Sequence, residues 1–240
     1  MGIIVPAIIP TSKEDLEGKL AQLQGLCEEV QIDIVDGKYA RPASWPYTVD
    51  AAEPSRMLAE GEMLPYAGEI GFEIDLMSVD PESVAGVWIE LGAKRLTIHA
   101  ESTRYLRRFL ETARTVFGHD AGFASNFLSL GLSIGTETDL SLIEPFIEKI
   151  DYVQFMGVRT IGHQGEPFSP GVLTRIVAFR KKYPHIPVQV DGGVTLANAP
   201  SLLEAGVSRL VVGSALWKAP ILGEQYRAFD ALTEEYGIYG

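Results

Sequence analysis

The chain has 240 residues, of which 46% are hydrophobic and 22% charged, and its formal net charge is −12. This composition is typical of a globular protein, and we expect residues 1–240 to form a single domain. The net negative charge argues against nucleic acids and anionic membranes as partners, because both bind positively charged surfaces. It leaves small anionic ligands open, since backbone N–H groups can hold them locally.

The chain has one cysteine, Cys27, so an internal disulfide is excluded. Its place beside Leu23 and Leu26 in an amphipathic segment predicts a packed thiol rather than a nucleophile. The first residues, MGIIVPAIIPTS, lack both a basic region and a small-residue cleavage site, so we predict no signal peptide. No apolar run approaches the ~20 residues of a membrane span. We therefore expect a soluble, cytoplasmic protein.

Short β-branched runs alternate with longer segments of helical periodicity through the first half of the chain. Ser12 and Asp15 have the spacing of a helix N-terminal cap, and Pro81 suits a first helical turn. The expected strands are residues 3–9, 30–35, 70–77 and 95–100, and the expected helices begin near residue 12 and cover 56–60, 81–92 and 102–117.

The same alternation continues to the end of the chain. The expected strands lie within residues 130–135, 151–158, 186–194 and 208–216, and the expected helices are 139–150, 172–183, 197–206 and 224–235. Strands that alternate with helices predict parallel pairing and right-handed crossovers. Eight such units in 240 residues favour a (β/α)₈ TIM barrel over an open doubly wound sheet.

Polar residues gather at the predicted carboxyl ends of the strands, which is where such barrels carry their chemistry. A single carboxylate there is often only a cap for the next loop or helix. Several that converge from different strands favour function, and we predict it for Asp33, Asp75 and Asp191. Both interpretations stay open for Asp36 and Glu73.

Glycines mark the ends of the last two predicted strands, where TIM barrels commonly hold a phosphate on backbone N–H groups. Gly192 and Gly193 follow Asp191, and Gly213 and Ser214 follow the eighth strand. The loop after the sixth strand, GVRTIGHQGEPF, contributes Gly162 and Gly165 and is typical of a mobile lid. We predict that these six residues bind a phosphate group.

Six segments, in order and spacing, resemble the ribulose-phosphate 3-epimerase family: IDIVDG, DLMSVDPE, LTIHAE, DYVQFMGV, VQVDGGV and VVGSAL. The resemblance spans nearly the whole chain. It implies a phosphate-binding TIM barrel that interconverts ribulose 5-phosphate and xylulose 5-phosphate. It also implies that Asp33 and Asp191 exchange the C3 proton from opposite faces of the sugar, through an enediolate.

The chain departs from the family at both histidine positions of the metal site, at Ala7, where the family has a serine, and in the loop after the sixth strand, which is one residue longer and lacks the family's PGFGGQ pattern. The family binds a divalent metal through the two aspartates and two histidines, and the histidine positions are Gln31 and Asp75 here. Imidazole suits zinc and iron, whereas oxygen ligands suit harder ions. The sequence thus leaves two alternatives. Either magnesium or manganese, rather than zinc, binds to oxygen ligands from Asp33, Asp75, Asp191 and Gln31, or no metal binds.

Without a metal, a cation such as Arg159 or Lys38 would have to stabilise the enediolate. His99 fits the family's LTIHAE-like segment but equally suits a buried core histidine. His119 and His185 are expected in surface loops.

Two alternatives to the epimerase remain. One is a related isomerase or lyase acting on another sugar phosphate, although the D-x-K-x-x-D pattern of the related decarboxylases and synthases is absent from EIDLMSVD. The other is a non-catalytic phosphosugar-binding protein that has lost its metal site. Retention of both Asp33 and Asp191 favours catalysis. We expect a small phosphorylated sugar as the substrate and a homo-oligomeric assembly.

Overall fold

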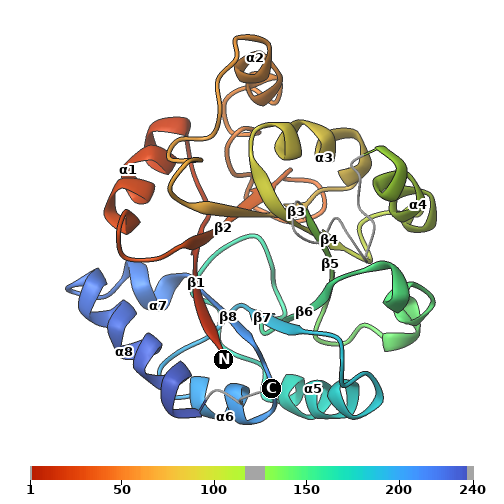
Figure 1. Ribbon diagram of the computed structural model, residues 1–240, viewed down its shortest axis with the longest axis vertical. Helices are drawn as coiled ribbons and strands as arrows, with labels where there is room; N and C mark the ends of the chain where they lie inside the picture. Colours follow the sequence, from red (N-terminus) through yellow and green to blue (C-terminus); the bar gives the residue numbers. More distant parts are fainter. Residues whose placement is uncertain (1, 117–127, 237–240) are drawn as a thin grey trace.

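Eight parallel strands close into a barrel with helices around the outside (Figure 1). The structure is a computed structural model that describes residues 2–116 and 128–236. Each strand pairs with the next in the sequence, and β8 closes the barrel by pairing with β1. The prediction of a (β/α)₈ TIM barrel is confirmed.

The strands agree with the predicted segments to within a few residues. They are β1 (Ile3–Ile8), β2 (Glu29–Val35), β3 (Gly71–Met77), β4 (Ala93–His99), β5 (Ser129–Ile134), β6 (Tyr152–Met156), β7 (Val188–Asp191) and β8 (Arg209–Val212). The α-helices are α1 (Lys13–Leu23), α2 (Glu53–Ala59), α3 (Pro81–Glu90), α4 (Leu106–Val116), α5 (Gly171–Lys182), α6 (Ala199–Glu204), α7 (Ser214–Trp217) and α8 (Leu222–Tyr236).

Local sequence explains where helices begin, and one predicted helix is wrong. The Ser12 side chain accepts a hydrogen bond from the Asp15 N–H at 3.1 Å and caps α1, as its spacing predicted. Residues 139–150 form two 3₁₀ helices, η2 (Leu140–Leu142) and η3 (Glu144–Lys149), instead of one α-helix. Pro145 explains the break, because proline has no N–H to donate to the preceding turn.

The two faces of the strands have different chemistry. Successive side chains of a strand point to opposite faces, so alternate residues face the helices and the barrel interior. The outward residues, such as Ile32, Ile74 and Val190, are fully buried in one large hydrophobic cluster with the helices. The inward residues are mostly polar. Gly131 of β5 leaves space inside the barrel for the ring of Tyr152, which a Cβ would overlap.

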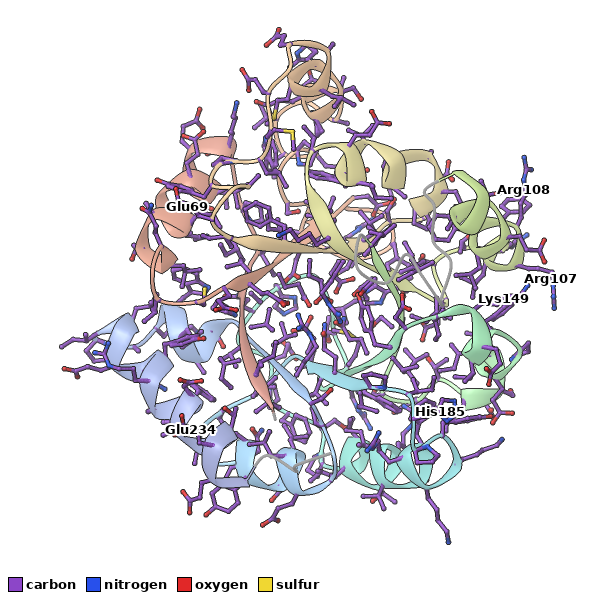
Figure 2. All side chains as sticks on the ribbon, viewed as in Figure 1. Glu69, Arg107, Arg108, Lys149, His185 and Glu234 are labelled. Carbon is purple, nitrogen blue, oxygen red and sulfur yellow. The ribbon has the colours of Figure 1, made fainter. Side chains whose placement is uncertain are left out.

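Charged side chains cover the outside of the barrel, and Figure 2 shows Arg107, His185 and Glu234 pointing outward from the helices and loops around it. Cys27 is buried, and burial raises the pKa of its thiol to about 12, in keeping with the predicted packing role. No helix within residues 2–116 and 128–236 combines the length and apolar character needed to cross a membrane.

Candidate active site

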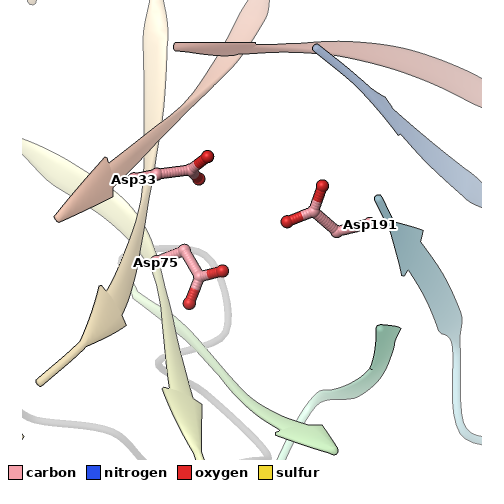
Figure 3. A group of neighbouring side chains, drawn as sticks. All are labelled: Asp33, Asp75 and Asp191. Atoms are coloured by element: carbon pink, nitrogen blue, oxygen red, sulfur yellow. The ribbon is translucent and has the colours of Figure 1, made fainter. Parts of the chain in front are cut away.

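Three aspartates meet inside the barrel near the carboxyl ends of their strands. Asp33 and Asp75 are paired in register on β2 and β3, and Asp191 ends β7. One carboxylate oxygen from each lies within 4.8 Å of the others. Figure 3 shows the three carboxylates directed toward one another, with Asp191 facing Asp33 and Asp75 across the barrel mouth. The convergence predicted from the strand ends is confirmed.

Gln31 joins two of these aspartates. Its side-chain Nε2 donates to Asp33 Oδ1 at 2.7 Å and to Asp191 Oδ2 at 3.0 Å. Gln31 lies two residues before Asp33, so both side chains face the barrel interior. One buried amide group thus uses both of its N–H bonds to hold two carboxylates from different strands at a fixed separation.

Asp75 has different partners. Its Oδ2 accepts from Gln154 Nε2 at 3.0 Å, and His99 Nε2 lies 3.1 Å from its Oδ1. The alignment of His99 with Oδ1 is poor, so this buried oxygen has no hydrogen bond within the described residues. The His99 ring packs against Tyr39, with centroids 5.3 Å apart. His99 is therefore part of the aspartate cluster rather than of the apolar core.

Crowding of negative charge changes how the aspartates bind protons. Burial raises the pKa of Asp33, and the neighbouring charges of Asp191 and Asp75 raise it further. Burial and the charge of Asp75 raise the pKa of Asp191 to about 7, although the hydrogen bond from Gln31 opposes the change. The pair can therefore hold a proton near neutral pH, which acid–base catalysis requires.

A second charged layer lies deeper in the barrel, around Glu73. Arg95 Nε and Arg209 Nη2 both lie 3.0 Å from Glu73 Oε2. Burial alone would raise the pKa of Glu73, but the two guanidinium groups and several hydrogen bonds bring it to about 2. Glu73 is thus an ionised carboxylate paired with two guanidinium groups. These contacts favour a structural role for Glu73 over a functional one.

All six residues predicted to bind phosphate line one small cavity beside the aspartates. The cavity has a volume of about 40 Å³, and its lining includes Gly162, Gly165, Gly192, Gly193, Gly213, Ser214, Asp33 and Asp191. Gly192 and Gly193 have φ angles of 99° and 68°, which favour glycine. Within the described residues, no backbone hydrogen bond uses the N–H of Gly192, Gly193 or Ser214.

The loop between β6 and α5 lies over this cavity. Gln164 of the loop donates from Nε2 to the Ala7 carbonyl at 3.1 Å, and its amide also lies where a Cβ on Gly213 would be. Trp217 Nε1 donates to the same carbonyl at 2.7 Å. The contacts of Gln164 fasten the loop to β1 and to the end of β8, and the Trp217 hydrogen bond holds α7 to the same carbonyl of β1.

Other candidates lie away from the aspartates. The Asp36 carboxylate accepts from the N–H groups of Lys38, Tyr39 and Val79, and so holds the loops after β2 and β3 together. Lys38 is exposed, and the 73% exposed side chain of Arg159 pairs with Glu137. His185 is exposed as predicted, and His119 lies outside the described residues.

The sequence analysis missed Gln164 of the loop after β6 and several polar residues of the interior: Arg95, Gln154, Gln189 and Arg209. A signal for one of them was present, because Gln189 lies two residues before Asp191, just as Gln31 precedes Asp33. Residues two apart on a strand share a face. The period that placed Gln31 inside the barrel therefore also places Gln189 there.

The three aspartates fit a divalent cation. Their carboxylate oxygens suit hard ions, and the unbonded, buried Oδ1 of Asp75 is an available ligand atom. Gln31 is oriented differently, because its Oε1 accepts from Gln189 Nε2 at 3.1 Å. Ligation by Gln31, which the sequence suggested, requires its amide to turn over and lose that hydrogen bond.

Comparisons with known proteins show which family the chain resembles. A sequence model described as the ribulose-phosphate 3 epimerase family matches residues 3–217. The chain is 29% identical to the chloroplastic ribulose-5-phosphate-3-epimerase of Arabidopsis thaliana over 95% of this chain and 76% of that one. It is 24% identical to ribulose-phosphate 3-epimerase of Bacillus subtilis over 89% of this chain and 91% of that one.

Among solved structures, the fold is similar to that of KGPDC from Streptococcus mutans, with a TM-score of 0.70. The two sequences are 11% identical, and the comparison covers 98% of this chain and 99% of the other. At that identity the likeness concerns the barrel fold alone.

Proposed function

Since the chain belongs to the ribulose-phosphate 3-epimerase family, and is therefore a sugar-phosphate epimerase, we propose that it interconverts ribulose 5-phosphate and xylulose 5-phosphate. The observation that carries this proposal is the pair of buried carboxylates, Asp33 and Asp191, bridged by one amide at the barrel mouth. An epimerase must remove a proton from one face of a carbon and return one to the other. Two carboxylates from different strands supply one group for each face.

The proposed reaction begins with one aspartate ionised and the other protonated. The ionised carboxylate takes the proton from C3, and the electron pair of the C–H bond moves toward the C2 carbonyl to give an enediolate. The protonated carboxyl then donates to the opposite face of C3, so the carbon is inverted and the two aspartates have exchanged protonation states. The raised pKa of Asp191, about 7, supports its carrying a proton at neutral pH.

The phosphate group of the substrate would bind to the backbone N–H groups of Gly192, Gly193, Gly213 and Ser214. Two observations support this part of the proposal. These residues line the cavity beside Asp33 and Asp191, and the N–H groups of Gly192, Gly193 and Ser214 donate to no backbone oxygen of the described residues. Backbone donors also suit a protein whose net charge is −12, because they add no titratable group to the site.

Gly162 and Gly165 would act through the loop after β6. A cavity of about 40 Å³ is far smaller than the ~300 Å³ of a typical ligand pocket, so substrate entry requires the loop to open. Gly162 and Gly165 have φ angles of 95° and 100°. Gln164, between them, would release Ala7 and Gly213 as the loop opens. The same loop would then exclude water from the closed complex.

A divalent cation, if bound, would be held by Asp33, Asp75 and Asp191, and we propose magnesium or manganese rather than zinc. All three ligands offer oxygen, and the family's histidine positions are Gln31 and Asp75. When bound, such a cation supplies positive charge beside the enediolate oxygens. The protein's own contribution is to hold the three carboxylates together and to direct Gln31 toward two of them.

An assay that couples xylulose 5-phosphate formation to a second enzyme tests the proposal. The purified protein is given ribulose 5-phosphate, first after treatment with a chelator and then with added Mg²⁺, Mn²⁺ or Zn²⁺. We expect turnover that Mg²⁺ or Mn²⁺ sustains at least as well as Zn²⁺. Tight binding of ribulose 5-phosphate without turnover under all four conditions would instead support a non-catalytic phosphosugar-binding protein.

A further inference from the structure

Three glutamines form a connected layer beneath the aspartates. Gln31, Gln154 and Gln189 come from β2, β6 and β7, and each is 0% exposed. A primary amide has an accepting end and a donating end, so the way it is turned decides what it offers to a neighbour. In a closed, buried layer, one amide that is fixed in orientation determines the orientation of the next.

Gln189 is fixed by charged groups. Arg209 Nε donates to its Oε1 at 2.8 Å, and its Nε2 donates to Glu73 Oε1 at 2.6 Å. A guanidinium group has no acceptor and an ionised carboxylate has no donor. Reversing the Gln189 amide would therefore set donor against donor and acceptor against acceptor at the same time.

Gln189 passes this orientation to both other glutamines. Its Nε2 lies 3.1 Å from Gln31 Oε1 and 2.7 Å from Gln154 Oε1, so its two N–H bonds are shared among these two oxygens and Glu73 Oε1. With their oxygens turned toward Gln189, Gln31 and Gln154 present N–H groups on the opposite side, toward the aspartates. Gln31 donates to Asp33 Oδ1 and Asp191 Oδ2, and Gln154 donates to Asp75 Oδ2.

The aspartates alone would not fix Gln31 during the reaction. In the proposed function, on which this inference rests, one of Asp33 and Asp191 is protonated at each stage. A protonated carboxyl can donate to an amide oxygen as well as accept from an amide N–H. Without Gln189, Gln31 would be free to turn its oxygen toward that proton and hold it away from the substrate.

We propose that Gln189 is a positioning residue of the active site, which transmits the orientation set by Arg209 and Glu73 to Gln31. Gln31 then occupies Oδ1 of Asp33 and Oδ2 of Asp191 with N–H donors. The other two oxygens, Asp33 Oδ2 and Asp191 Oδ1, are left to exchange protons with the substrate. Within the described residues, no hydrogen bond engages either of these two oxygens.

The variant Gln189→Met tests this role in turnover, because it keeps the length and approximate volume of the side chain but removes both ends of the amide. We expect kcat to fall about 10- to 100-fold, the range for a hydrogen bond to a charged group. KM should change little, since the glycines that hold the phosphate are elsewhere. Leu210→Met, at a fully buried residue on the helix-facing side of β8, is the matched packing control and should retain wild-type kcat.

A double-mutant cycle separates positioning from simple packing. If Gln189 acts through Gln31, then Gln31→Met combined with Gln189→Met should be no slower than the slower single variant. If Gln189 only fills space, the two losses should multiply. Multiplied losses, or a Gln189→Met enzyme with wild-type kcat, would overturn the proposal.

A measurement on the wild-type protein needs neither substrate nor a folded variant. NMR of the side-chain amides should show nuclear Overhauser effects from the Gln31 Nε2 protons to the β-protons of Asp33 and Asp191. It should also show slow exchange of these protons with solvent. Amide protons of Gln31 directed toward Gln189 would refute the orientation even if turnover is confirmed. Correct orientation in a protein that lacks epimerase activity would count against the proposed function alone.

Discussion

The barrel interior holds two carboxylate layers with opposite electrostatics. Glu73, in the deeper layer, lies between Arg95 and Arg209, which bring its pKa to about 2. For Asp33 and Asp191, at the mouth, burial and the negative charge of Asp75 raise the pKa values, although the hydrogen bonds from Gln31 oppose this. Arg209 Nη2 also lies 2.7 Å from Glu29 Oε2, so the two guanidinium groups of the deeper layer are balanced by two carboxylates. The aspartates at the mouth have no such balance, because negative charges surround them.

The difference separates structural from functional carboxylates. A buried charge with matched partners is fixed in one protonation state and contributes to the unique packing of the interior. Buried carboxylates without a matched cation bind protons near neutral pH or attract a metal ion, and such groups concentrate at active sites. The two layers are also joined by hydrogen bonds, because Gln189 and Gln31 connect Glu73 of the deeper layer to Asp33 and Asp191 at the mouth.

The largest effect is expected from breaking the balanced layer. Glu73→Gln leaves the guanidinium groups of Arg95 and Arg209 buried without their shared carboxylate, which should lower the free energy of unfolding by about 3–5 kcal/mol. Urea unfolding at pH 7 measures this decrease in the free energy of unfolding. Asp75→Asn is the matched control on the same strand, and its loss should be smaller. Equal losses in the two variants would contradict the distinction between the layers.

Removing a proton-exchanging carboxylate should reduce turnover strongly while leaving the fold intact. Asp33→Asn and Asp191→Asn keep the side-chain shape but remove the acid–base group, so each should lower kcat by more than ~10²-fold. Asp75→Asn should cost less if no metal takes part and about as much if Asp75 is a ligand. Turnover on a confirmed substrate, with circular dichroism to verify folding, is the measurement; near-wild-type kcat in both variants would refute the mechanism.

The unbalanced layer should cost the protein stability, in a way that depends on pH. The folded pKa of Asp191, about 7, lies above its ordinary value of 3.8. The folded state therefore binds more protons than the unfolded state between these values, and stability falls as pH rises from about 4 to about 7. Asp191→Asn removes this loss.

At pH 8 the Asp191→Asn variant should exceed the wild type by at least about 1 kcal/mol in free energy of unfolding. The excess should disappear at pH 3, where the wild-type carboxyl is protonated in both states. Unfolding curves of the two proteins from pH 3 to pH 8 give the comparison. Curves that stay parallel would mean that Asp191 titrates alike in the folded and unfolded states.

The last prediction concerns a metal ion. Mg²⁺ or Mn²⁺ bound by the aspartates would neutralise part of the unbalanced charge, and a concentration tenfold above Kd adds about 1.4 kcal/mol of stability. Thermal unfolding of the chelator-treated protein with each ion detects this. Asp75→Asn should remove the gain. A gain that persists in this variant would place the ion elsewhere.

The barrel architecture could be predicted because each strand and helix leaves its own periodic pattern in a short stretch of the sequence. Alternating strand and helix periods indicated the barrel, and period two put Asp33 and Asp75 inside it. The apolar spacing of residues 139–150 is that of an α-helix, but the segment forms 3₁₀ helices because Pro145 has no N–H to donate to the preceding turn. The position of Asp33, Asp75 and Asp191 at one rim followed from topology alone, since all parallel strands end on the same side.

The contacts that distinguish the two layers were beyond the sequence. Arg209 is 136 residues from Glu73, and Gln189 is 158 residues from Gln31, so no local pattern joins them. Which end of the Gln31 amide faces the aspartates depends on that distant partner. The sequence therefore offered Gln31 as an oxygen ligand, whereas in the structure it donates N–H bonds to Asp33 and Asp191.

Epimerisation in D₂O, followed by proton NMR at C3, tests the two-carboxylate account most directly. Starting from ribulose 5-phosphate, the wild-type protein should form xylulose 5-phosphate that carries deuterium at C3, because the proton returned to the sugar comes from the second aspartate. The Asp33→Asn and Asp191→Asn variants should each form the epimer far more slowly than the wild-type protein. Xylulose 5-phosphate that retains the original C3 proton, or its formation at the wild-type rate by either variant, would contradict the account.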